Sequence, residues 1–406
     1  MTNRTVTITH IGHRGDGIAG EIFVPFTLPG EKVEVSGTGD RLALERVITP
    51  SADRKDPFCP HFGKCGGCAL QHWEGEPYRE WKRDLIAAAL RQQGITAEIG
   101  DTIDAHGAGR RRVTLHARRI PGSALVVGFT EARTHTIIPI DVCPILAPQL
   151  SGAIGAARAL AACLVPKAKP VDVQVTAAEN GLDVDVSGIG PVSVKDREAL
   201  LSVAASRQFA RLTLLGELVY QREPPWIMVG PARVVLPPRS FLQATHAGEE
   251  VLAELVSDAV GPARAIADLF CGIGPFALRL AANARVVAAD SDAQAVAALA
   301  TAARSVRGLK PVTAETRDLS RRPLLPADVK SLDAVIFDPP RAGAEAQCRA
   351  LAKADVGCLV AVSCNPATFA RDAAILIAGG WKIDGITPVD QFKYSAHVEL
   401  VARFSR

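Results

Sequence analysis

The spacing of apolar and polar positions changes twice along the chain, and these changes divide it into three regions. Residues 1–52 alternate in short apolar runs broken by glycine-rich turns such as GDGIAG, which predicts a compact all-β module. Residues 53–230 open with a cysteine-rich loop and a helix near 78–93, and then continue as mixed, strand-rich sequence. Residues 231–406 alternate strands with helices, which predicts a parallel, doubly wound sheet. We therefore expect an α/β protein in which this sheet follows a small β-barrel and a central α+β domain.

The predicted strands of the third region end in residues that can do chemistry. The elements expected there are helices over 248–260, from 275, over 292–306 and over 344–353, and the strands ARAIADLF, RVVAAD, PVTAET, LDAVIFDPP and GCLVAVSC. In such sheets ligands bind beyond the carboxyl ends of the strands. The polar residues that fall at these ends are Asp268, Asp290, Asp338 and Cys364. We expect them to surround one site.

The stretch DLFCGIGPF predicts a cofactor-binding turn between a strand and a helix. Gly272 and Gly274 would let the backbone approach a ligand, and the amino end of the helix would supply free N–H groups. Asp290 ends the next strand, where a carboxylate can accept hydrogen bonds from both hydroxyls of a ribose. A dinucleotide fingerprint would place a third glycine where Ala277 stands. The acidic residue Asp268 and the missing glycine favour S-adenosylmethionine, which has no pyrophosphate to seat.

The motif Asp338-Pro339-Pro340 follows another predicted strand. In amino-group methyltransferases such a motif is followed by an aromatic residue that stacks on a planar nitrogen nucleophile. Arg341 occupies that position here, which argues against methylation of the adenine amino group. Asp338 would still face both the methyl donor and a planar substrate.

Cys364 and Glu399 form the pair that methylation of a pyrimidine at C5 requires. C5 of the aromatic base is a poor nucleophile, but a thiolate that adds to C6 loads electron density onto it. A base must then remove the C5 proton so that the thiolate can leave. Cys364 stands where a strand opens into the Asn-Pro turn, and Glu399, in YSAHVELVARF, is the natural candidate for the base.

The stretches DLFCGIGPF, FDPPR, SCNPATFARD and HVE, in this order, resemble the RNA uracil-C5 methyltransferases, which make 5-methyluridine. The resemblance covers nearly the whole chain, although residues 150–230 carry no usable motif. It implies that Cys364 is the nucleophile, Glu399 the proton-abstracting base and Asp338 a carboxylate near the target base. It also implies that Gln243, in PRSFLQAT, contacts the methyl donor. The residues expected at the cofactor are Gln243, Asp268, Phe270, Gly272, Gly274, Asp290 and Asp338.

Two departures from the family pattern affect details of these contacts. The stretch around Gln243 usually ends in asparagine where Thr245 stands, and the segment before HVE usually reads more like FPHT than FKYSA. Neither changes the thiol or the carboxylate.

The chain has nine cysteines, and metal binding or catalysis explains them better than disulfides in the absence of a secretion signal. Cys59, Cys65 and Cys68 are spaced C-x5-C-x2-C, and Cys143, in DVCPI, is the best candidate for a fourth ligand. Four thiolates can hold a zinc ion or an iron–sulfur cluster, and spacing does not separate the two. We expect the others outside the active site, Cys163, Cys271, Cys348 and Cys358, to be structural.

The family resemblance extends to this pattern and implies a more detailed domain organisation. Its 23S ribosomal RNA branch carries a [4Fe–4S] cluster on such cysteines, after a TRAM module with an OB-like barrel. The implied domains are a TRAM-like barrel at 1–52, an iron–sulfur and RNA-binding domain at 53–230 and a Rossmann-like class I methyltransferase domain at 231–406.

Composition and charge add little to this picture. The chain is 48% hydrophobic, 22% charged and carries a net charge of +3, which is compatible with an RNA partner. The arginines 110–112, 118 and 119 indicate either a phosphate-facing strand or an exposed basic strand. Without an apolar run long enough for a membrane span, or a signal segment, we expect a cytoplasmic monomer that does not bind membranes.

Several functions stay open at this level. The favoured one is methylation of a uridine in 23S ribosomal RNA, and the nearest alternative is a transfer RNA uridine. Another methyltransferase, acting on cytosine C5 or on adenine, fits less well, because the cytosine enzymes of RNA generally carry PC or TC where Ser363-Cys364 stands. A non-catalytic RNA-binding or ribosome assembly factor is the alternative from a different class, and it would not need the cofactor residues.

Overall fold

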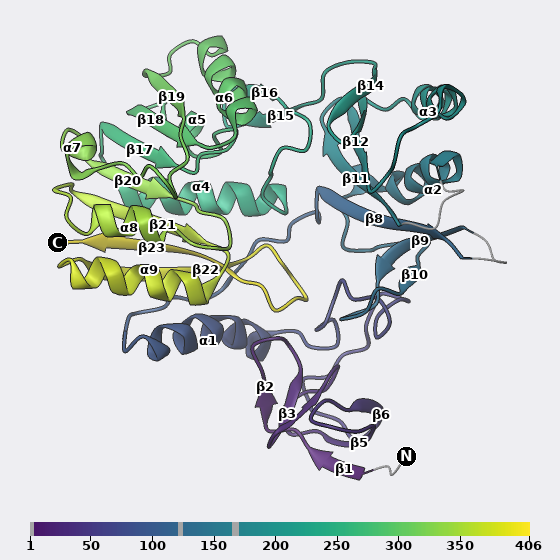
Figure 1. The fold of residues 1–406 in the computed structure, drawn as a ribbon. Helices are drawn as coiled ribbons and strands as arrows, with labels where there is room; N and C mark the ends of the chain where they lie inside the picture. The colour runs from purple at the N-terminus through teal and green to yellow at the C-terminus, as the bar shows by residue number, and fades with distance from the viewer. Residues whose placement is uncertain (1–3, 121–124, 165–169) are drawn as a thin grey trace.

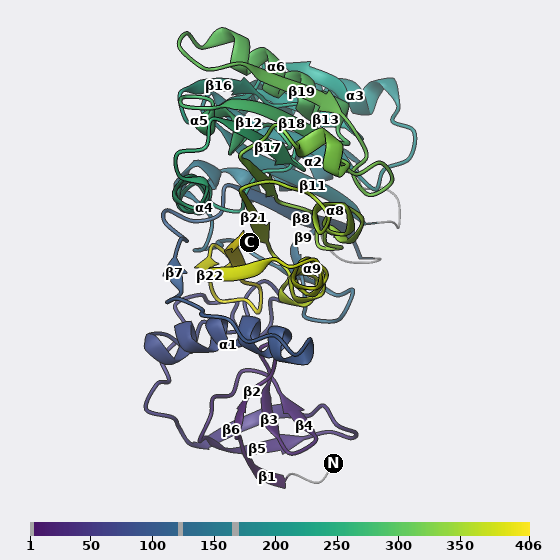
Figure 2. The ribbon, with the colours of Figure 1, turned by 90° about the vertical axis from the view of Figure 1, so that its left-hand side faces the viewer.

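The computed structural model describes residues 4–120, 125–164 and 170–406 of the 406-residue chain. Figure 1 shows an N-terminal unit below two larger β-rich units that lie next to each other, and Figure 2 shows the N-terminal unit at one end of the molecule. The site predicted from the sequence belongs to the C-terminal unit.

The N-terminal unit consists of two small antiparallel sheets with strand orders β1-β5-β6 and β2-β3-β4. Its strands are β1 Arg4–Thr7, β2 His10–Ile11, β3 Gly17–Ala19, β4 Ile22–Val24, β5 Lys32–Ser36 and β6 Ala43–Thr49. Alternate residues of these strands enclose a small core made by Ile8, Val24, Val33, Val35 and Leu42. A side chain at Gly17 would collide with Thr27, because its Cβ would lie 2.0 Å from Thr27 Oγ1. Gly17, the middle glycine of GDGIAG, is therefore needed for close packing.

The middle unit contains a seven-stranded sheet of order β10-β9-β8-β11-β12-β13-β14. Its strands are β8 Arg112–Arg119, β9 Leu125–Thr130, β10 Ile137–Pro139, β11 Val171–Ala178, β12 Gly181–Ser187, β13 Arg211–Leu214 and β14 Glu217–Gln221. The short helix η1 Pro148–Leu150 and the helices α2 Ala153–Leu164 and α3 Val194–Ser206 supply apolar side chains to its core. The strands β11 and β12 form a tight hairpin, because Ala178 pairs with Gly181.

The C-terminal unit contains an eight-stranded sheet of order β19-β18-β17-β20-β21-β23-β22-β7. Its strands are β7 Ile103–Asp104, β17 Ala265–Leu269, β18 Arg285–Asp290, β19 Val312–Thr316, β20 Ala334–Phe337, β21 Cys358–Ser363, β22 Lys382–Asp390 and β23 Glu399–Ser405. The strands from β19 to β21 are parallel, as the alternation of helices and strands predicts. β23 runs antiparallel to both β21 and β22.

Helices cover both faces of this sheet, which completes the doubly wound arrangement. One apolar layer contains residues of α4 His246–Val260, α5 Ala277–Leu280 and α6 Ala293–Ser305. The other layer contains residues of α1 Glu76–Gln92, α7 Pro326–Val329, α8 Glu345–Leu351 and α9 Pro366–Ala378. Because both faces are buried, the central strands are continuous apolar runs rather than alternating ones.

Two segments from outside residues 231–406 also pack on the C-terminal sheet. Helix α1 buries Ile86 and Leu90 in the same apolar layer as α9, and β7 extends the sheet by pairing with β22. The hairpin of β15 Trp226–Val229 and β16 Ala232–Val235 contributes to the opposite layer. Residues on the N-terminal side of the predicted boundary at 230 therefore also pack on the C-terminal sheet.

Among the helices of the described ranges, none combines the length and the apolar character that crossing a bilayer requires.

Candidate functional site

A cavity of about 640 Å³ opens at the carboxyl ends of the parallel strands. The sequence-predicted residues that line it are Gln243, Phe270, Gly272, Asp290, Asp338, Cys364 and Glu399. They come from strand ends and loops separated by as many as 156 positions, the distance between Gln243 and Glu399 in the numbering. The fold therefore brings nearly all of the predicted site together in one place.

The glycine turn shapes one wall of this cavity. Phe270, Gly272 and Gly274 all have left-handed backbone angles, with φ of 60°, 51° and 90°. A Cβ on Gly274 would lie 2.4 Å from Leu299 Cδ1 of α6, so only glycine lets the turn approach this helix. Asp290 supports the turn from the neighbouring strand, since its Oδ2 accepts a hydrogen bond from the Gly272 amide at 2.9 Å.

Two predicted residues, Asp268 and Gly274, lie behind the wall rather than among the lining residues. The Asp268 side chain is fully buried, and its Oδ2 accepts a hydrogen bond from the Ala277 amide, at the start of α5, at 2.9 Å. Burial raises the pKa of Asp268 to about 8, and the charges of Asp338 and Asp290 add to this effect. Asp268 thus holds the start of the helix that follows the glycine turn.

A chain of hydrogen bonds connects the two carboxylates of the site through two buried glutamines. The Gln243 amide donates from Nε2 to Asp338 Oδ2 at 3.0 Å. The Gln391 amide donates from Nε2 to Gln243 Oε1 at 2.7 Å and to Glu399 Oε2 at 2.9 Å. Gln391 also accepts from the Ala244 amide at 2.9 Å, which fixes its orientation.

Gln391 is a functional residue that the sequence interpretation missed. It belongs to none of the recognised motifs, and a lone glutamine in DQFKYSA gives no signal of burial. It follows directly after β22, whose Val389 pairs with Glu399, and this proximity to Glu399 becomes visible only in the paired strands.

Both carboxyl groups have raised pKa values in this environment. Burial raises the pKa of Glu399 well above its usual range, and the nearby charge of Asp338 acts in the same direction. Burial also raises the pKa of Asp338. Two carboxylates this close cannot both ionise easily without a cation nearby, which is the electrostatic setting of acid–base sites.

Cys364 is the first residue after β21, so the strand ends one residue before the predicted end at Cys364. Asn365 follows as the N-cap of α9 and accepts from the Ala367 amide at 3.1 Å, so the thiol sits where the strand turns into the helix. Burial, together with the charges of Glu399 and Asp338, raises the pKa of Cys364 to about 11, and the charge of Arg341 partly opposes this rise. The thiol is therefore protonated at neutral pH in the free protein.

Arg111 and Arg112 contact other parts of the protein and do not form the predicted exposed or phosphate-facing basic strand. Arg111 is buried, and it donates from Nε to the Gln243 carbonyl at 3.0 Å and from Nη2 to Glu249. Arg112 donates to the Ser240 carbonyl. The prediction of a phosphate-facing or exposed strand was wrong for these two, because their side chains donate hydrogen bonds to backbone carbonyls of the segment that ends at Gln243. Arg118 and Arg119 are exposed at the end of β8.

Thr245, one of the departures from the family pattern, has a clear structural role. Its hydroxyl accepts from the Gly248 amide at 2.8 Å as the N-cap of α4, and it donates to the Ala105 carbonyl at 2.6 Å. The threonine thus satisfies a helix end that would otherwise leave a free amide.

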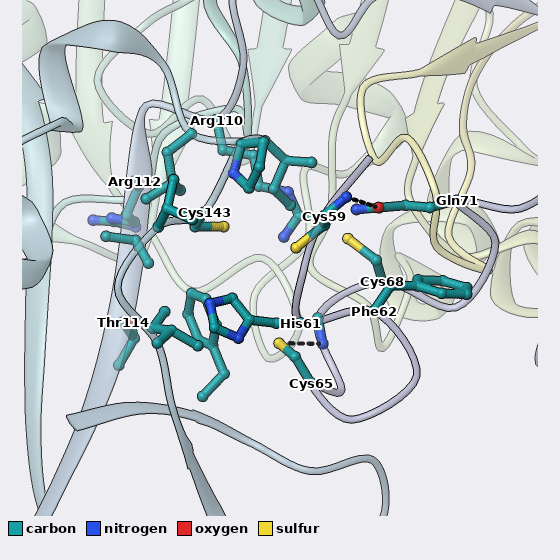
Figure 3. Close-up of a pocket in the computed structure, with 18 residues that line it drawn as sticks. Cys59, His61, Phe62, Cys65, Cys68, Gln71, Arg110, Arg112, Thr114 and Cys143 are labelled. Carbon is teal, nitrogen blue, oxygen red and sulfur yellow. Dashed lines mark hydrogen bonds between the residues drawn. The ribbon is translucent and has the colours of Figure 1, made fainter. Parts of the chain in front are cut away.

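The four cysteines predicted as ligands line a second cavity, of about 220 Å³. Cys59, Cys65 and Cys68 come from the loop before α1, and Cys143 follows β10 in the middle unit. Figure 3 shows their sulfur atoms turned toward the same space. The loop is tied to the middle sheet, because the Gly66 amide donates to the Thr130 carbonyl at 3.0 Å.

The four thiols of this cavity are a donor set that can hold a zinc ion or an iron–sulfur cluster. In the described ranges, no three or more His, Cys, Asp or Glu side chains are already grouped so closely that they could hold a metal ion. His61 Nε2 and Arg110 Nε, which belong to the same lining, are buried without a hydrogen-bond partner in the described structure. Such donors suit the sulfur atoms of a bound cluster.

Three of the four cysteines predicted to be structural are buried, namely Cys271, Cys348 and Cys358, and Cys163 is partly buried in α2. None of the four lines the cysteine cavity, and only Cys271 lines the large one.

The fold and the cavity at the strand ends define a class I methyltransferase domain within a larger chain. A crystal structure of the tRNA (uracil-54, C5)-methyltransferase of Pyrococcus abyssi, with S-adenosyl-L-homocysteine bound, has the same overall fold. It superposes with a TM-score of 0.73 at 23% identity, over 99% of this chain and 100% of that one.

Sequence comparisons identify the family. Residues 237–405 match the family model "tRNA (Uracil-5-)-methyltransferase". An uncharacterized RNA methyltransferase of Brucella suis is 46% identical over 98% of this chain and 96% of its own length. The 23S rRNA (uracil(1939)-C(5))-methyltransferase of Salmonella typhi is 31% identical over 99% of this chain and 96% of its own. The chain belongs to the RNA uracil-C5 methyltransferase family, and its methyl donor is S-adenosylmethionine.

The environment of Cys364 predicts slow alkylation of this thiol at neutral pH. Its pKa of about 11 means that the thiolate fraction, and with it the rate, should rise about tenfold per pH unit from about pH 7 to about pH 10. The measurement is peptide mapping by mass spectrometry after timed exposure of the RNA-free protein to iodoacetamide, with Cys364→Ser as the control for peptide assignment. A rate that levels off near about pH 8, as for an ordinary cysteine, would contradict the raised pKa.

Proposed function

We propose that the protein methylates C5 of a uridine in 23S ribosomal RNA, with Cys364 as the nucleophile and Glu399 as the base. The observation that carries the proposal is that both side chains line the same cavity as the glycine turn, where a methyl donor would bind. A thiol and a carboxyl group on one cavity wall are the two groups that C5 methylation requires.

The reaction begins when the Cys364 thiolate bonds to C6 of the uracil, and the electron pair of the C5–C6 double bond moves onto C5 and the C4 carbonyl. S-adenosylmethionine, when bound, would supply the methyl group: the bond between the methyl carbon and the sulfonium sulfur would break as C5 takes the methyl, and neutral S-adenosylhomocysteine would be left. Glu399 then takes the proton from C5. The electrons of the C5–H bond restore the C5–C6 double bond as the bond between C6 and the sulfur of Cys364 breaks, so the free thiolate is regenerated.

The hydrogen-bond chain explains how the base is oriented. Gln391 donates to Glu399 and leaves the other carboxylate oxygen available for the C5 proton. Gln243 and Asp338 form the opposite end of the chain and border the glycine turn. A cationic methyl donor in this cavity would favour the ionised forms of the carboxyl groups, whose pKa values are raised in the free protein. The base would then be active only in the loaded complex.

The choice of 23S ribosomal RNA as the target rests on the full-length similarity to the Salmonella typhi enzyme that acts on this RNA. A transfer RNA target is the second candidate, because the matched family model and the Pyrococcus abyssi structure carry transfer RNA names. In either RNA the target uridine must be unpaired or extruded, because C6 is inaccessible inside a base stack. The cavity fits a non-catalytic RNA-binding factor poorly, because such a factor needs no thiol beside a donor site.

We also propose that the cysteine cavity holds a [4Fe–4S] cluster, with Cys59, Cys65, Cys68 and Cys143 as ligands. Burial and the neighbouring thiols raise the pKa of Cys143 to about 12, so a metal centre would stabilise the thiolates that the free protein disfavours. The cluster would join the loop before α1 to the middle sheet. We assign the cluster a structural or RNA-positioning role. The TRAM-like barrel and the middle domain would also contact the RNA. We propose that the protein acts as a cytoplasmic monomer.

Substitution of the two catalytic residues should stop the reaction at different points. Cys364→Ala is expected to abolish methyl transfer, because no thiolate can activate C5. Glu399→Gln is expected to slow turnover by about a hundredfold or more and to accumulate a covalent protein–RNA adduct, because the C5 proton stays in place. Methyl transfer is measured with labelled donor, and the adduct by denaturing electrophoresis. Full turnover by Cys364→Ala would refute the mechanism.

Deletion of the gene should remove 5-methyluridine from 23S ribosomal RNA. The modification is mapped by mass spectrometry of ribosomal and transfer RNA from cells with and without the protein, and expression of Cys364→Ala serves as the control for catalysis. Loss of 5-methyluridine from transfer RNA alone would select the second candidate target instead.

Anaerobic purification should yield a brown protein with a broad visible absorbance and about four iron and four sulfide ions per chain. Cys143→Ser is expected to lower the iron content, and Cys163→Ser, which lies outside the cavity, should leave it unchanged. A colourless preparation with one zinc ion per chain would overturn the cluster assignment.

A further inference from the structure

The loop between β22 and β23, residues 391–398, supports the catalytic side of the cavity. Gln391 at its start bridges Gln243 and Glu399. Phe392 lines the cavity, and Glu399 begins β23 directly after the loop. The position of loop 391–398 therefore determines where the Glu399 carboxylate lies.

A lysine that is distant in the sequence holds both ends of this loop. Lys82 of α1 donates from Nζ to Asp390 Oδ1, at the end of β22, at 2.9 Å. The same Nζ donates to the Phe392 carbonyl at 3.5 Å and to the His397 carbonyl, two residues before Glu399. An ammonium group has three N–H donors, so Lys82 directs all of them to this one loop and its first flanking residue.

Packing alone does not explain why a charged lysine occupies this buried position. The side chains of Lys82 and Asp390 are 0% and 4% exposed. Removing two charges from water is costly, and apolar residues of similar size usually stabilise such a place as well or better. What the ammonium adds is direction, because it fixes two backbone carbonyls and a carboxylate relative to each other.

Two further contacts hold the same loop. Tyr78, also on α1, donates from its hydroxyl to Asp390 Oδ2 at 2.8 Å and accepts from the Tyr394 amide at 2.9 Å. On the other side, the Ala69 and Leu70 amides of the cysteine-rich loop donate to the Tyr394 carbonyl at 2.8 and 3.1 Å. The catalytic loop is thus held by segments that precede the methyltransferase domain in the sequence.

We propose that Lys82 is a positioning residue for the removal of the C5 proton. It acts through loop 391–398 on Gln391 and Glu399 and does not touch the substrate. The inference rests on the proposed role of Glu399 as the base. It predicts that loss of Lys82 mimics, in a weaker form, the loss of Glu399, although the glutamate itself is intact.

The test compares Lys82→Met with the double variant Lys82→Met/Asp390→Asn. The single variant leaves the Asp390 charge buried with only Tyr78 as a partner, so it can lose stability. The double variant removes both charges, so no unpaired buried charge destabilises the fold, and the hydrogen bonds of Lys82 to loop 391–398 are still lost. For a folded double variant we expect kcat to fall by roughly tenfold to a hundredfold, KM for RNA to change less than about twofold, and the covalent protein–RNA adduct to accumulate.

Hydrogen exchange gives a second readout that is independent of catalysis. The backbone amides of loop 391–398 should exchange faster in the double variant than in the wild-type protein. Tyr78→Phe keeps the ring and removes the hydroxyl contacts to the same loop, so it should shift both readouts in the same direction by a smaller factor. Arg83→Met is the matched control, because Arg83 lies on the same helix in an exposed pair with Asp101 at 3.6 Å.

The outcomes separate this inference from the proposed function. Wild-type turnover without adduct in a folded double variant, or unchanged exchange in the loop, would overturn the role of Lys82 even if Glu399→Gln behaves as expected. Absence of an adduct in Glu399→Gln would instead count against the proposed mechanism. Faster exchange confined to loop 391–398 would in that case still support Lys82 as the residue that holds the loop.

Discussion

The hydrogen-bond chain from Asp338 through Gln243 and Gln391 to Glu399 is the interaction on which the site depends. It joins the end of a parallel strand, the segment before α4 and the two antiparallel strands at the far side of the sheet. Each amide uses its donor on a carboxylate or on the next amide, so a shift of one member leaves another buried group unpaired. The arrangement holds Asp338 and Glu399 in the wall of the cavity that Cys364 also lines.

The C-terminal unit does not build this chain alone. Arg111 of the middle unit holds the Gln243 carbonyl, and Lys82 of α1 holds the loop that carries Gln391. Both arginine and lysine are buried, and both make hydrogen bonds to backbone carbonyls rather than to solvent. The methyltransferase fold therefore supplies the strands, and the preceding segments set the positions of the side chains that project from the strand ends.

The cysteine-rich loop contacts loop 391–398, which Lys82 holds, and also the middle sheet. It donates two amides to the Tyr394 carbonyl, inside loop 391–398, and is tied to the middle sheet through Gly66. A centre that holds Cys143 and the loop together would stiffen the contact between the middle unit and the catalytic loop. This would be a structural role for the proposed centre, and it requires no electron transfer.

The sequence by itself determined the parts of the protein whose chemistry depends on local pattern. The doubly wound sheet follows from the alternation of helices and strands, and the glycine turn, Asp290, Asp338, Cys364 and Glu399 follow from motifs at strand ends. These residues line one cavity because the carboxyl ends of the parallel strands lie along one edge of the sheet, and the antiparallel strand β23 begins with Glu399 at the same edge. The tertiary structure alone decided the rest. Gln391 and Lys82 have no motif, and the direction of the arginines 111 and 112 depends on which segments lie against them. Most hydrogen-bond partners of these side chains lie more than a hundred positions away in the sequence, and no local pattern records them.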